Sequence, residues 1–459
     1  MSSMQQKSKQ LELPLIGRNK GETCKSPKGV EEFVTGCHQE TSVIEHSLME
    51  EVVEKENLWK ALKQVRRNGG SPGIDGTTVK ELPEYLKENW LRIKGELLTG
   101  TYRPSPVKRT EIPKPSGGKR RLGIPTVLDR FIQQALNQVL QKRWDKTFSE
   151  SSFGFRPNLS AHHAIAKAQR YIQSGSRWVV DIDLEKFFDK VNHDKLMGLV
   201  SKRIKDKRVL TLIRGFLNSG VMNKGLFTRT EEGTPQGGPL SPLLSNLMLD
   251  ELDKELERRG HKFARYADDC NVYVRSKKAG GRVMESVKKF LGNKLKLKVN
   301  ETKSRVDRPW KIKFLGYTFS LTYKGMVNRK VAAESIKRFK YRVREITRRT
   351  RGISLRNMIH DLATYLKGWM GYFGFAEVNS LFKDLDKWIR RRLRSMMWKQ
   401  WGRRGYKELR KRGISRELAW NTCKSAHGPW RLSHSPALEI ALSVSFFVKL
   451  GLPQLMNMI

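Results

Sequence analysis

Two adjacent carboxylates, Asp268 and Asp269, lie between two short runs of residues typical of β-strands. The runs cover residues 262–265 and 271–274, so the sequence predicts a β-hairpin with both acids at its tight turn. Neighbouring carboxylates repel each other unless a positive group lies between them, and hard divalent cations prefer oxygen ligands. The pair suits a metal ion, although solvated turns carry similar pairs.

A second acidic segment supplies a third carboxylate. Residues 178–182 (WVVDI) form an apolar run typical of a buried strand, and Asp183 follows at its end. A buried charge is costly there without a partner. If this strand lies beside the hairpin in one sheet, Asp183, Asp268 and Asp269 converge. Three such carboxylates can hold two Mg²⁺ ions for in-line phosphoryl transfer to a 3′ hydroxyl.

Predicted helices alternate with these strands. The spacing of apolar residues predicts helices near residues 44–67, 126–145, 160–174, 193–219 and 239–258. Residues 107–123 form a candidate basic hairpin with strands at 108–112 and 119–124. The loop 69–77 is rich in Gly and Pro, and it either touches a template or only connects elements. These elements predict an α+β fold in which strands position both acidic turns.

The chain is strongly basic. Its 459 residues include 90 Lys and Arg against 46 Asp and Glu, which gives a net charge of +44 and a pI of about 10.3. A polyanion is the expected partner, because each neutralised phosphate releases counterions. With 38% hydrophobic residues and basic residues spread throughout, the excess charge belongs to a folded surface rather than to a disordered tail.

Composition also argues against several classes of protein. The four cysteines are too scattered for a zinc or disulfide framework, so we expect reduced thiols. No apolar run has membrane-spanning length, and residues 437–450, interrupted by Glu439 and Lys449, predict a core helix. Residues 1–43 lack the apolar segment of a signal peptide and predict a flexible leader. We therefore expect a cytoplasmic protein without a membrane partner.

Several ordered segments resemble the motifs of group II intron reverse transcriptases. They are residues 102–106, 112–126 (IPKPSGGKRRLGIPT), 152–157 (SFGFRP), 181–189 (DIDLEKFFD), 233–242 (GTPQGGPLSP), 263–269 (FARYADD), 295–303 and 314–319 (FLGYTF). The resemblance covers about residues 50–430 and is nearest to the compact class C proteins without an endonuclease. It implies a right-hand polymerase fold with fingers and palm, RNA-templated DNA synthesis, and catalytic metal ligands at Asp183, Asp268 and Asp269.

The same resemblance implies a site for the deoxynucleoside triphosphate. The residues concerned are Lys114, Arg120, Phe188, Gln236 and Lys303. Lys114 and Arg120, or its neighbour Arg121, would contact the triphosphate from the basic hairpin. Phe188 would exclude the ribose 2′ hydroxyl, unless its ring packs in the core. Gln236 would line the pocket, and Lys303 would lie near the leaving pyrophosphate, where a general acid is needed.

The composition changes after about residue 325. Residues 331–420 hold 24 Lys and Arg against 8 Asp and Glu, with helical periodicity and interleaved aromatics. Charges suit RNA phosphates, whereas aromatics either stack on bases or form a helical core, which we expect for Trp369, Tyr372 and Trp388. Residues 365–373 and 385–393 resemble the thumb or maturase domain of intron-encoded proteins. Its candidate RNA-binding residues are Arg390, Arg391, Arg392 and Arg394.

The predicted organisation has five parts. They are a flexible leader (1–43), an N-terminal extension and the start of the fingers (44–105), fingers and palm (106–325), an α-helical thumb or maturase domain (326–425) and a DNA-binding-like region (426–459). The resemblance implies group II intron RNA, an RNA template with a DNA primer, and target DNA as partners, in a bacterial cytoplasm or on its nucleoid. Without an endonuclease pattern, priming would use a pre-existing 3′ end. A reverse transcriptase domesticated for DNA repair or defence, or a splicing-only RNA-binding protein, stays an alternative.

Overall fold

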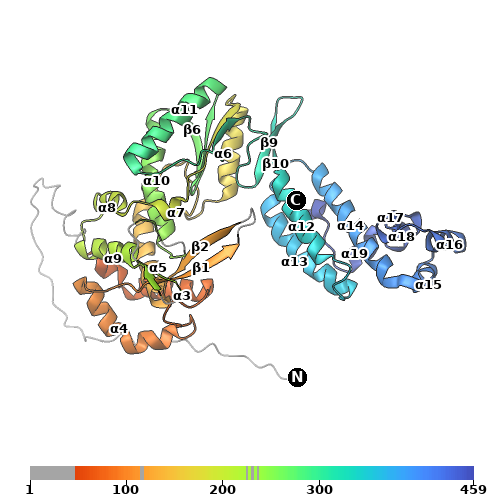
Figure 1. The fold of residues 1–459 in the computed structure, drawn as a ribbon, viewed down its shortest axis with the longest axis horizontal. Coiled ribbons are helices and arrows are strands. Elements are labelled where there is room, and N and C mark those ends of the chain that lie inside the picture. The colour runs from red at the N-terminus through yellow and green to blue at the C-terminus, as the bar shows by residue number, and fades with distance from the viewer. Residues whose placement is uncertain (1–46, 114–117, 224–225, 229–231, 235–236, 459) are drawn as a thin grey trace, which may run out of the picture. The chain divides into compact units, whose positions relative to one another are not determined.

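The computed structural model describes residues 47–458, except 114–117, 224–225, 229–231 and 235–236 (Figure 1). The predicted leader, Lys114 and Gln236 therefore lie outside the described residues. The chain divides into two compact units. Of the described residues, unit 1 contains those up to Ser160, Ile182–Cys270 and Arg282–Arg305; unit 2 contains Ala161–Asp181, Asn271–Gly281 and those from Val306 onward.

Helices dominate the first two thirds of the chain. They are α2 (Leu48–Val52), α3 (Lys55–Asn68), α4 (Leu82–Thr99), α5 (Val127–Trp144), η1 (Asp145–Thr147), α6 (Ala161–Gln173), α7 (Phe187–Lys190), α8 (His193–Ser201), α9 (Lys207–Asn218), α10 (Ser241–Arg258), α11 (Lys277–Phe290) and the π-helical turn η2 (Leu291–Leu295). The helix α5 begins where a Thr and an Asp cap its first turn: the Thr126 hydroxyl accepts from Asp129 N at 3.1 Å and donates to the Asp129 carboxylate at 2.7 Å.

The strands form three small sheets. They are β1 (Val107–Pro113), β2 (Lys119–Ile124), β3 (Trp178–Ile182), β4 (Val221–Asn223), β5 (Leu226–Thr228), β6 (Lys262–Tyr266), β7 (Asp269–Val274), β8 (Arg305–Asp307), β9 (Tyr317–Leu321) and β10 (Val327–Val331). The sheet orders are β2-β1-β4-β5, β10-β9 and β6-β7-β3-β8. Strands β1 and β2 pair antiparallel with Lys108 opposite Ile124, which confirms the predicted basic hairpin. The strand predicted at 178–182 is β3 with the same bounds.

Two long predicted helices are each divided. The segment 193–219 forms α8 and α9, because the Asp206 carboxylate caps a new helix by accepting from Arg208 N at 3.0 Å. The same carboxylate accepts from Met49 N at 3.0 Å, so a contact distant in sequence fixes this break. Likewise the described part of 44–67 forms α2 and α3. Uninterrupted helices at both places were wrong predictions, since apolar periodicity can continue across a break in the helix.

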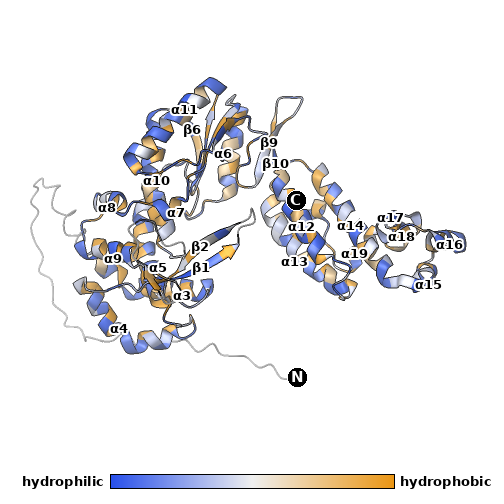
Figure 2. Cartoon of the chain, in the orientation of Figure 1, coloured by the Kyte–Doolittle hydropathy of each residue, from blue (hydrophilic) through white to orange (hydrophobic). Residues whose placement is uncertain are grey.

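The last third of the chain is almost wholly helical. Its helices are α12 (Ala333–Ile346), α13 (Leu355–Phe373), α14 (Ser380–Trp401), η3 (Gly402–Arg404), α15 (Gly405–Lys411), α16 (Arg416–Lys424), α17 (Pro429–Leu432), α18 (Pro436–Ala441), α19 (Val444–Lys449) and η4 (Leu455–Met458). Apolar and polar residues alternate around most helices (Figure 2), as amphipathic packing requires. The single core helix predicted at 437–450 is two short helices, because Ser443 caps the second one. Searched over the described residues, no helix has the length and apolarity needed to cross a membrane.

Candidate active site

The predicted acidic hairpin is present. Strand β6 ends at Tyr266 and β7 begins at Asp269, so the turn consists of Ala267 and Asp268. Ala267 has a left-handed backbone with φ of 58°, which costs a residue with a side chain about 1 kcal/mol. Such backbone strain clusters at functional sites, where the surrounding structure holds it in place. The strained turn therefore needs a support, which the buried residues beneath it supply.

Asp183 lies directly after β3, the neighbour of β7 in its sheet. The last residue of β3, Ile182, and the first two residues of β7, Asp269 and Cys270, belong to unit 1. The first residues of β3 and the last residues of β7 belong to unit 2. The two neighbouring strands therefore run in opposite directions. Asp183, Asp268 and Asp269 thus lie at the same edge of one sheet. Their role as metal ligands stays a prediction.

A lysine already faces one of these carboxylates. Residues 298–304 run beside Asp183, whose backbone carbonyl accepts from Asn300 N at 2.8 Å and whose N–H donates to Ser304 Oγ at 3.0 Å. This places Lys303 Nζ 3.2 Å from Asp183 Oδ2. Lys303 and Asp183 form an ion pair, but the geometry is not that of a hydrogen bond. Asp183 Oδ2 is buried and accepts no hydrogen bond from the described residues. The predicted lysine therefore does lie at the acidic edge.

The donor set suits a hard divalent cation, because the carboxylates of three aspartates supply only oxygen atoms. Within the described part of the chain, however, no three His, Cys, Asp or Glu side chains are close enough to hold a metal ion. The predicted triad is therefore at one edge without being drawn together. The Lys303 ammonium offsets part of the charge on Asp183.

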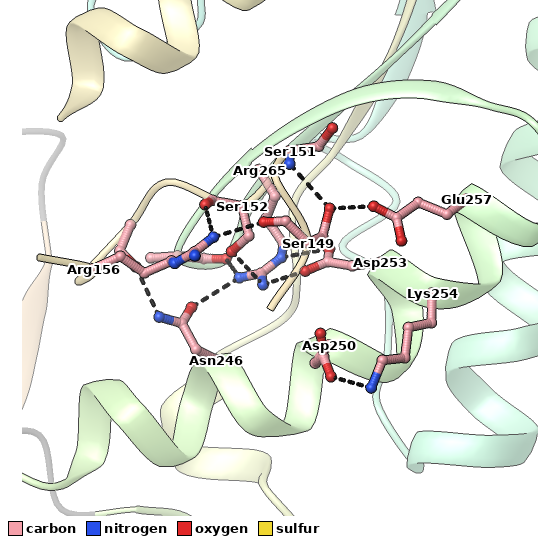
Figure 3. Close-up of polar contacts among 12 residues, drawn as sticks. Ser149, Ser151, Ser152, Arg156, Asn246, Asp250, Asp253, Lys254, Glu257 and Arg265 are labelled. Carbon is pink, nitrogen blue, oxygen red and sulfur yellow. Dashed lines mark hydrogen bonds and ion pairs between the residues drawn. The ribbon is translucent and has the colours of Figure 1, made fainter. Parts of the chain in front are cut away.

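A buried arginine, Arg265, bonds to the acidic turn and to residues of other segments, of which Figure 3 shows Ser152, Asn246 and Asp253. Arg265 is 0% exposed, and all five of its guanidinium N–H groups donate. Two bonds go to the buried carboxylate of Asp253, one of them at 2.7 Å. The others reach Asn246 Oδ1 at 3.1 Å, Ser152 Oγ at 2.7 Å and the Ala267 carbonyl at 2.9 Å. The guanidinium therefore ties the acidic turn to the helix α10.

The segment 152–157 closes against the same turn. Phe153 N donates to the Arg265 carbonyl at 2.9 Å, and Asn246 Nδ2 donates to the Gly154 carbonyl at 2.8 Å. A Cβ atom added at Gly154 would lie 2.3 Å from the backbone nitrogen of Ala267. Only glycine permits so close an approach of two backbones. In the sequence this motif was found by resemblance alone. In the structure it packs its backbone against the acidic turn.

A pocket of about 600 Å³ lies in unit 1. It is lined by Val65, Asn68, Gly69, Leu122, Arg130, Gln134, Phe155, Phe188, Gly237, Gly238, Pro239, Ser241 and Pro242. Phe188 is half-buried, whereas its neighbour Phe187 is 2% exposed, so Phe187 fills the core and Phe188 faces the pocket. The pocket thus joins residues from the basic hairpin, the acidic segment and the 233–242 motif, which lie far apart in sequence.

Arg130 is a pocket residue that sequence reasoning missed. Its guanidinium donates to the carbonyls of Gly69 at 3.2 Å and Ser71 at 2.8 Å, which holds the Gly-rich loop against α5. Burial lowers the pKa of Arg130, and its Nε has no partner among the described residues. The loop is therefore a fixed wall of the pocket. Contact with a template stays a prediction.

The structure does not describe the side chains of several predicted nucleotide-binding residues. Lys114 and Gln236 lie outside the described residues. Arg120 lies in β2 opposite Ile112 and Arg121 opposite Glu111, but their side chains are also outside the description. The nucleotide roles of these residues stay predictions.

Of the arginines predicted to bind RNA, Arg394 needs correction. It is 8% exposed, and its guanidinium donates to the Leu442 carbonyl at 3.0 Å and pairs with Glu439 at 3.2 Å. We therefore assign Arg394 to packing within unit 2 instead of RNA contact. Arg391 also has an internal contact, since its guanidinium carbon lies 4.1 Å from the centroid of the Trp430 ring.

The remaining two arginines and the aromatics differ in exposure. Arg390 and Arg392 are half-buried, and Arg392 Nε donates to Thr347 Oγ1 at 2.6 Å. Core packing is confirmed for Trp369, which is 8% exposed and packs among other aromatic rings. Trp388 is only half-buried and lines a second pocket, so only part of its side chain packs in the core as predicted.

Comparison with known proteins identifies the family. The family described as "Reverse transcriptase (RNA-dependent DNA polymerase)" matches residues 112–319, and "Group II intron, maturase-specific domain" matches residues 336–413. A relative from Escherichia coli (strain K12), Protein YkfC, is 35% identical over 51% of this chain and 72% of its own length. The chain belongs to the group II intron-encoded reverse transcriptases. The predicted pairing of a reverse transcriptase with a maturase domain on an α+β fold is confirmed.

A second relative is named for the intron itself. The group II intron-encoded protein LtrA of Lactococcus lactis subsp. cremoris is 31% identical over 53% of this chain and 52% of its own length, so this chain spans about half of LtrA. A solved chain of the "Partial Cas6-RT-Cas1--Cas2 complex" covers 54% of this chain and 42% of its own length at 25% identity, with a TM-score of 0.35. That score is too low to support a functional conclusion.

The matched domains give the chain its general chemistry. RNA-directed DNA polymerase is the activity of the reverse transcriptase domain, which uses divalent metal ions and deoxynucleoside triphosphates. The maturase-specific domain gives the chain a role in intron splicing, and group II intron maturases bind intron RNA.

Proposed function

We propose that this chain copies RNA into DNA with Mg²⁺ bound by Asp183, Asp268 and Asp269. The observation that carries the proposal is the single sheet edge that bears all three carboxylates together with Lys303. Two bound Mg²⁺ ions would supply charge neutralisation to the transferring phosphoryl group and activate the primer 3′ hydroxyl. Lys303 would move from Asp183 to the leaving pyrophosphate, to which an ammonium can donate a proton.

Primer extension by the purified chain tests this proposal directly. The assay combines an RNA template, a DNA primer, deoxynucleoside triphosphates and Mg²⁺. We expect extended DNA that disappears when EDTA removes the cation, because charge on the phosphoryl group then lacks its main compensation. Extension that persists with EDTA would contradict the metal assignment.

The pocket lined by Phe188 would hold the incoming nucleotide. Phe188→Ala should raise the use of ribonucleotides relative to deoxynucleotides by about tenfold or more, because the exclusion of a 2′ hydroxyl is steric. Phe188→Tyr keeps the ring and serves as the matched control, which should select as the wild type does. Both variants are compared by kcat/KM for each nucleotide. An unchanged ratio in the alanine variant would mean that the ring only packs in the core.

For the maturase domain, we propose an intron RNA as partner and a role in retrohoming to target DNA. The support is the excess of basic residues in 331–420, which can offset the repulsion between RNA strands that a folded intron brings together. A class C protein would extend a pre-existing 3′ end in the bacterial cytoplasm, at nucleoid DNA. A group II ribozyme in the DNA around the reading frame would favour this role over a domesticated enzyme for repair or defence.

Splicing and polymerisation should separate by mutation. Splicing is chemistry of the RNA, so Asp268→Ala should support splicing at the wild-type rate while it fails to extend a primer. Both rates are measured on the same protein preparation, with the transcript of the surrounding intron as splicing substrate. If the variant failed in both assays while remaining folded, the two functions would share one site.

A further inference from the structure

A second pocket lies wholly within unit 2 and has an unusual lining. Its volume is about 300 Å³, and it is lined by Arg344, Thr347, Arg349, Trp388, Arg392, Ser395 and Trp430. The residues come from α12, the turn after it, α14 and α17. The lining contains three arginines and no acidic residue. Such a concave cluster of cations suits an anion.

The three arginines have no ion-pair partner among the described residues. Their neighbours behave differently: Arg342 pairs with Glu345 at 2.8 Å, and Arg351 pairs with Asp361 at 3.1 Å. Burial and then the nearby charges of the other two pocket arginines lower the pKa of Arg392. The cations therefore repel one another at close range, which costs stability unless an anion binds.

The aromatic wall holds these cations in place. The guanidinium carbons of Arg344 and Arg392 lie 5.7 and 5.5 Å from the centroid of the Trp388 ring. Cation–π attraction to Trp388 and the bond from Arg392 Nε to Thr347 Oγ1 at 2.6 Å fix the direction of two guanidiniums. Arg392 Nη2 also donates to the carbonyls of Arg344 and Thr347 at 3.5 Å each. Bonds to a phosphate would therefore come from Arg392 Nη1 and from the guanidiniums of Arg344 and Arg349. The pocket is therefore organised before any ligand arrives.

We propose that this pocket binds one backbone phosphate of the intron RNA through Arg344, Arg349 and Arg392. The inference rests on the proposed role of the chain as an intron maturase. An RNA phosphate fits this lining better than a protein carboxylate, because its two non-bridging oxygens accept from arginines and a nucleotide beside it can pack on an aromatic ring of the same pocket. The half-exposed Trp430 at the rim lies where the sugar or base next to that phosphate would pack.

A charge-matched pair of double variants tests the site. R344Q/R349Q removes two arginines that line the pocket, whereas R342Q/R348Q removes two arginines of the same segment outside its lining, with the same loss of charge; all four are exposed. The probe is the transcript of the intron around the reading frame. We expect the pocket variant to bind it about tenfold or more weakly. The slope of log affinity against log salt should fall by about 0.7–0.9, as for the loss of one phosphate contact. The control should remain within about twofold of the wild type.

Ethylation of single phosphates in the transcript locates the contact. At least one ethylated phosphate should weaken binding of the wild type and of R342Q/R348Q but not of R344Q/R349Q. If both double variants bound the transcript equally weakly, or if ethylation of the same phosphates weakened binding of all three proteins, the phosphate site in this pocket would be overturned. The proposal that the chain binds intron RNA would stand. A wild-type protein that prefers the transcript no more than a tRNA would overturn the proposed function and the pocket together. Unchanged melting temperatures show that the variants fold.

Discussion

Asp268→Ala should slow primer extension about a thousandfold, because a lost metal ligand removes several kcal/mol of charge stabilisation from the phosphoryl transfer. Asp268 lies in the turn between β6 and β7, at the sheet edge that also carries Asp183 and Asp269. The measurement is the rate of single-nucleotide addition at saturating primer-template and nucleotide. Because the defect lies in the chemical step, the affinity for primer-template should not change.

The matched control is Asp194→Ala. Asp194 is another carboxylate of unit 1, exposed and paired with Arg214 at 2.8 Å. An exposed ion pair contributes little to stability, so this variant should extend primers at the wild-type rate. Wild-type extension by Asp268→Ala would remove Asp268 from the catalytic set.

Arg265→Met should destabilise the protein by about 3–5 kcal/mol, because it leaves the Asp253 carboxylate buried without its partner. Both side chains are 0% exposed in the structure. The measurement is the free energy of unfolding from urea titration. The variant should also lower kcat, since the Ala267 carbonyl loses the donor that holds the strained turn.

A double variant separates stability from positioning. Asp253→Leu combined with Arg265→Met removes both buried charges, so part of the lost stability should return. Extension should not return, because no donor reaches the Ala267 carbonyl. We expect a lowered kcat and a higher Mg²⁺ requirement with an unchanged KM for primer-template. A double variant with the kcat of the wild type would show that Arg265 serves stability alone.

Another buried acid on α10 provides the control. Asp250 is 0% exposed, pairs with Arg203 and Lys254 at 2.7 Å each, and has no described contact with the turn. Asp250→Leu with Arg203→Met should therefore change stability without changing the Mg²⁺ requirement. If it altered that requirement as the Arg265 variants do, a general loss of stability would explain both results.

Local pattern was enough to predict the elements that carry the chemistry. The apolar run before Asp183 gave the bounds of β3, and the two strand-forming runs on either side of Asp268 and Asp269 predicted the hairpin. These predictions succeed because strand and turn preferences act over a few neighbouring residues. The net charge indicated a polyanionic partner, because a sum of charges over the sequence does not depend on how the chain folds.

Contacts between distant segments were decided only by the tertiary structure. The Asp206 carboxylate caps the beginning of α9, and Met49 donates to the same carboxylate from 157 residues away. Arg394 is charged in sequence, yet folding buries it against Leu442 and Glu439. Charge alone does not say whether an arginine faces RNA or its own domain, since either partner can satisfy its N–H groups.

The sequence by itself indicated which residues to propose for phosphoryl transfer, because carboxylates supply the oxygen ligands that Mg²⁺ prefers and a lysine supplies a proton donor. The tertiary structure decided what holds them. In the sequence Arg265 is only one of two basic residues in the strand Lys262–Tyr266, whereas in the structure four of its five bonds reach Ser152, Asn246 and Asp253 from other elements. The phosphate pocket likewise exists only where α12, α14 and α17 meet. Buried polar groups must find partners in space, and sequence order does not specify which partners those are.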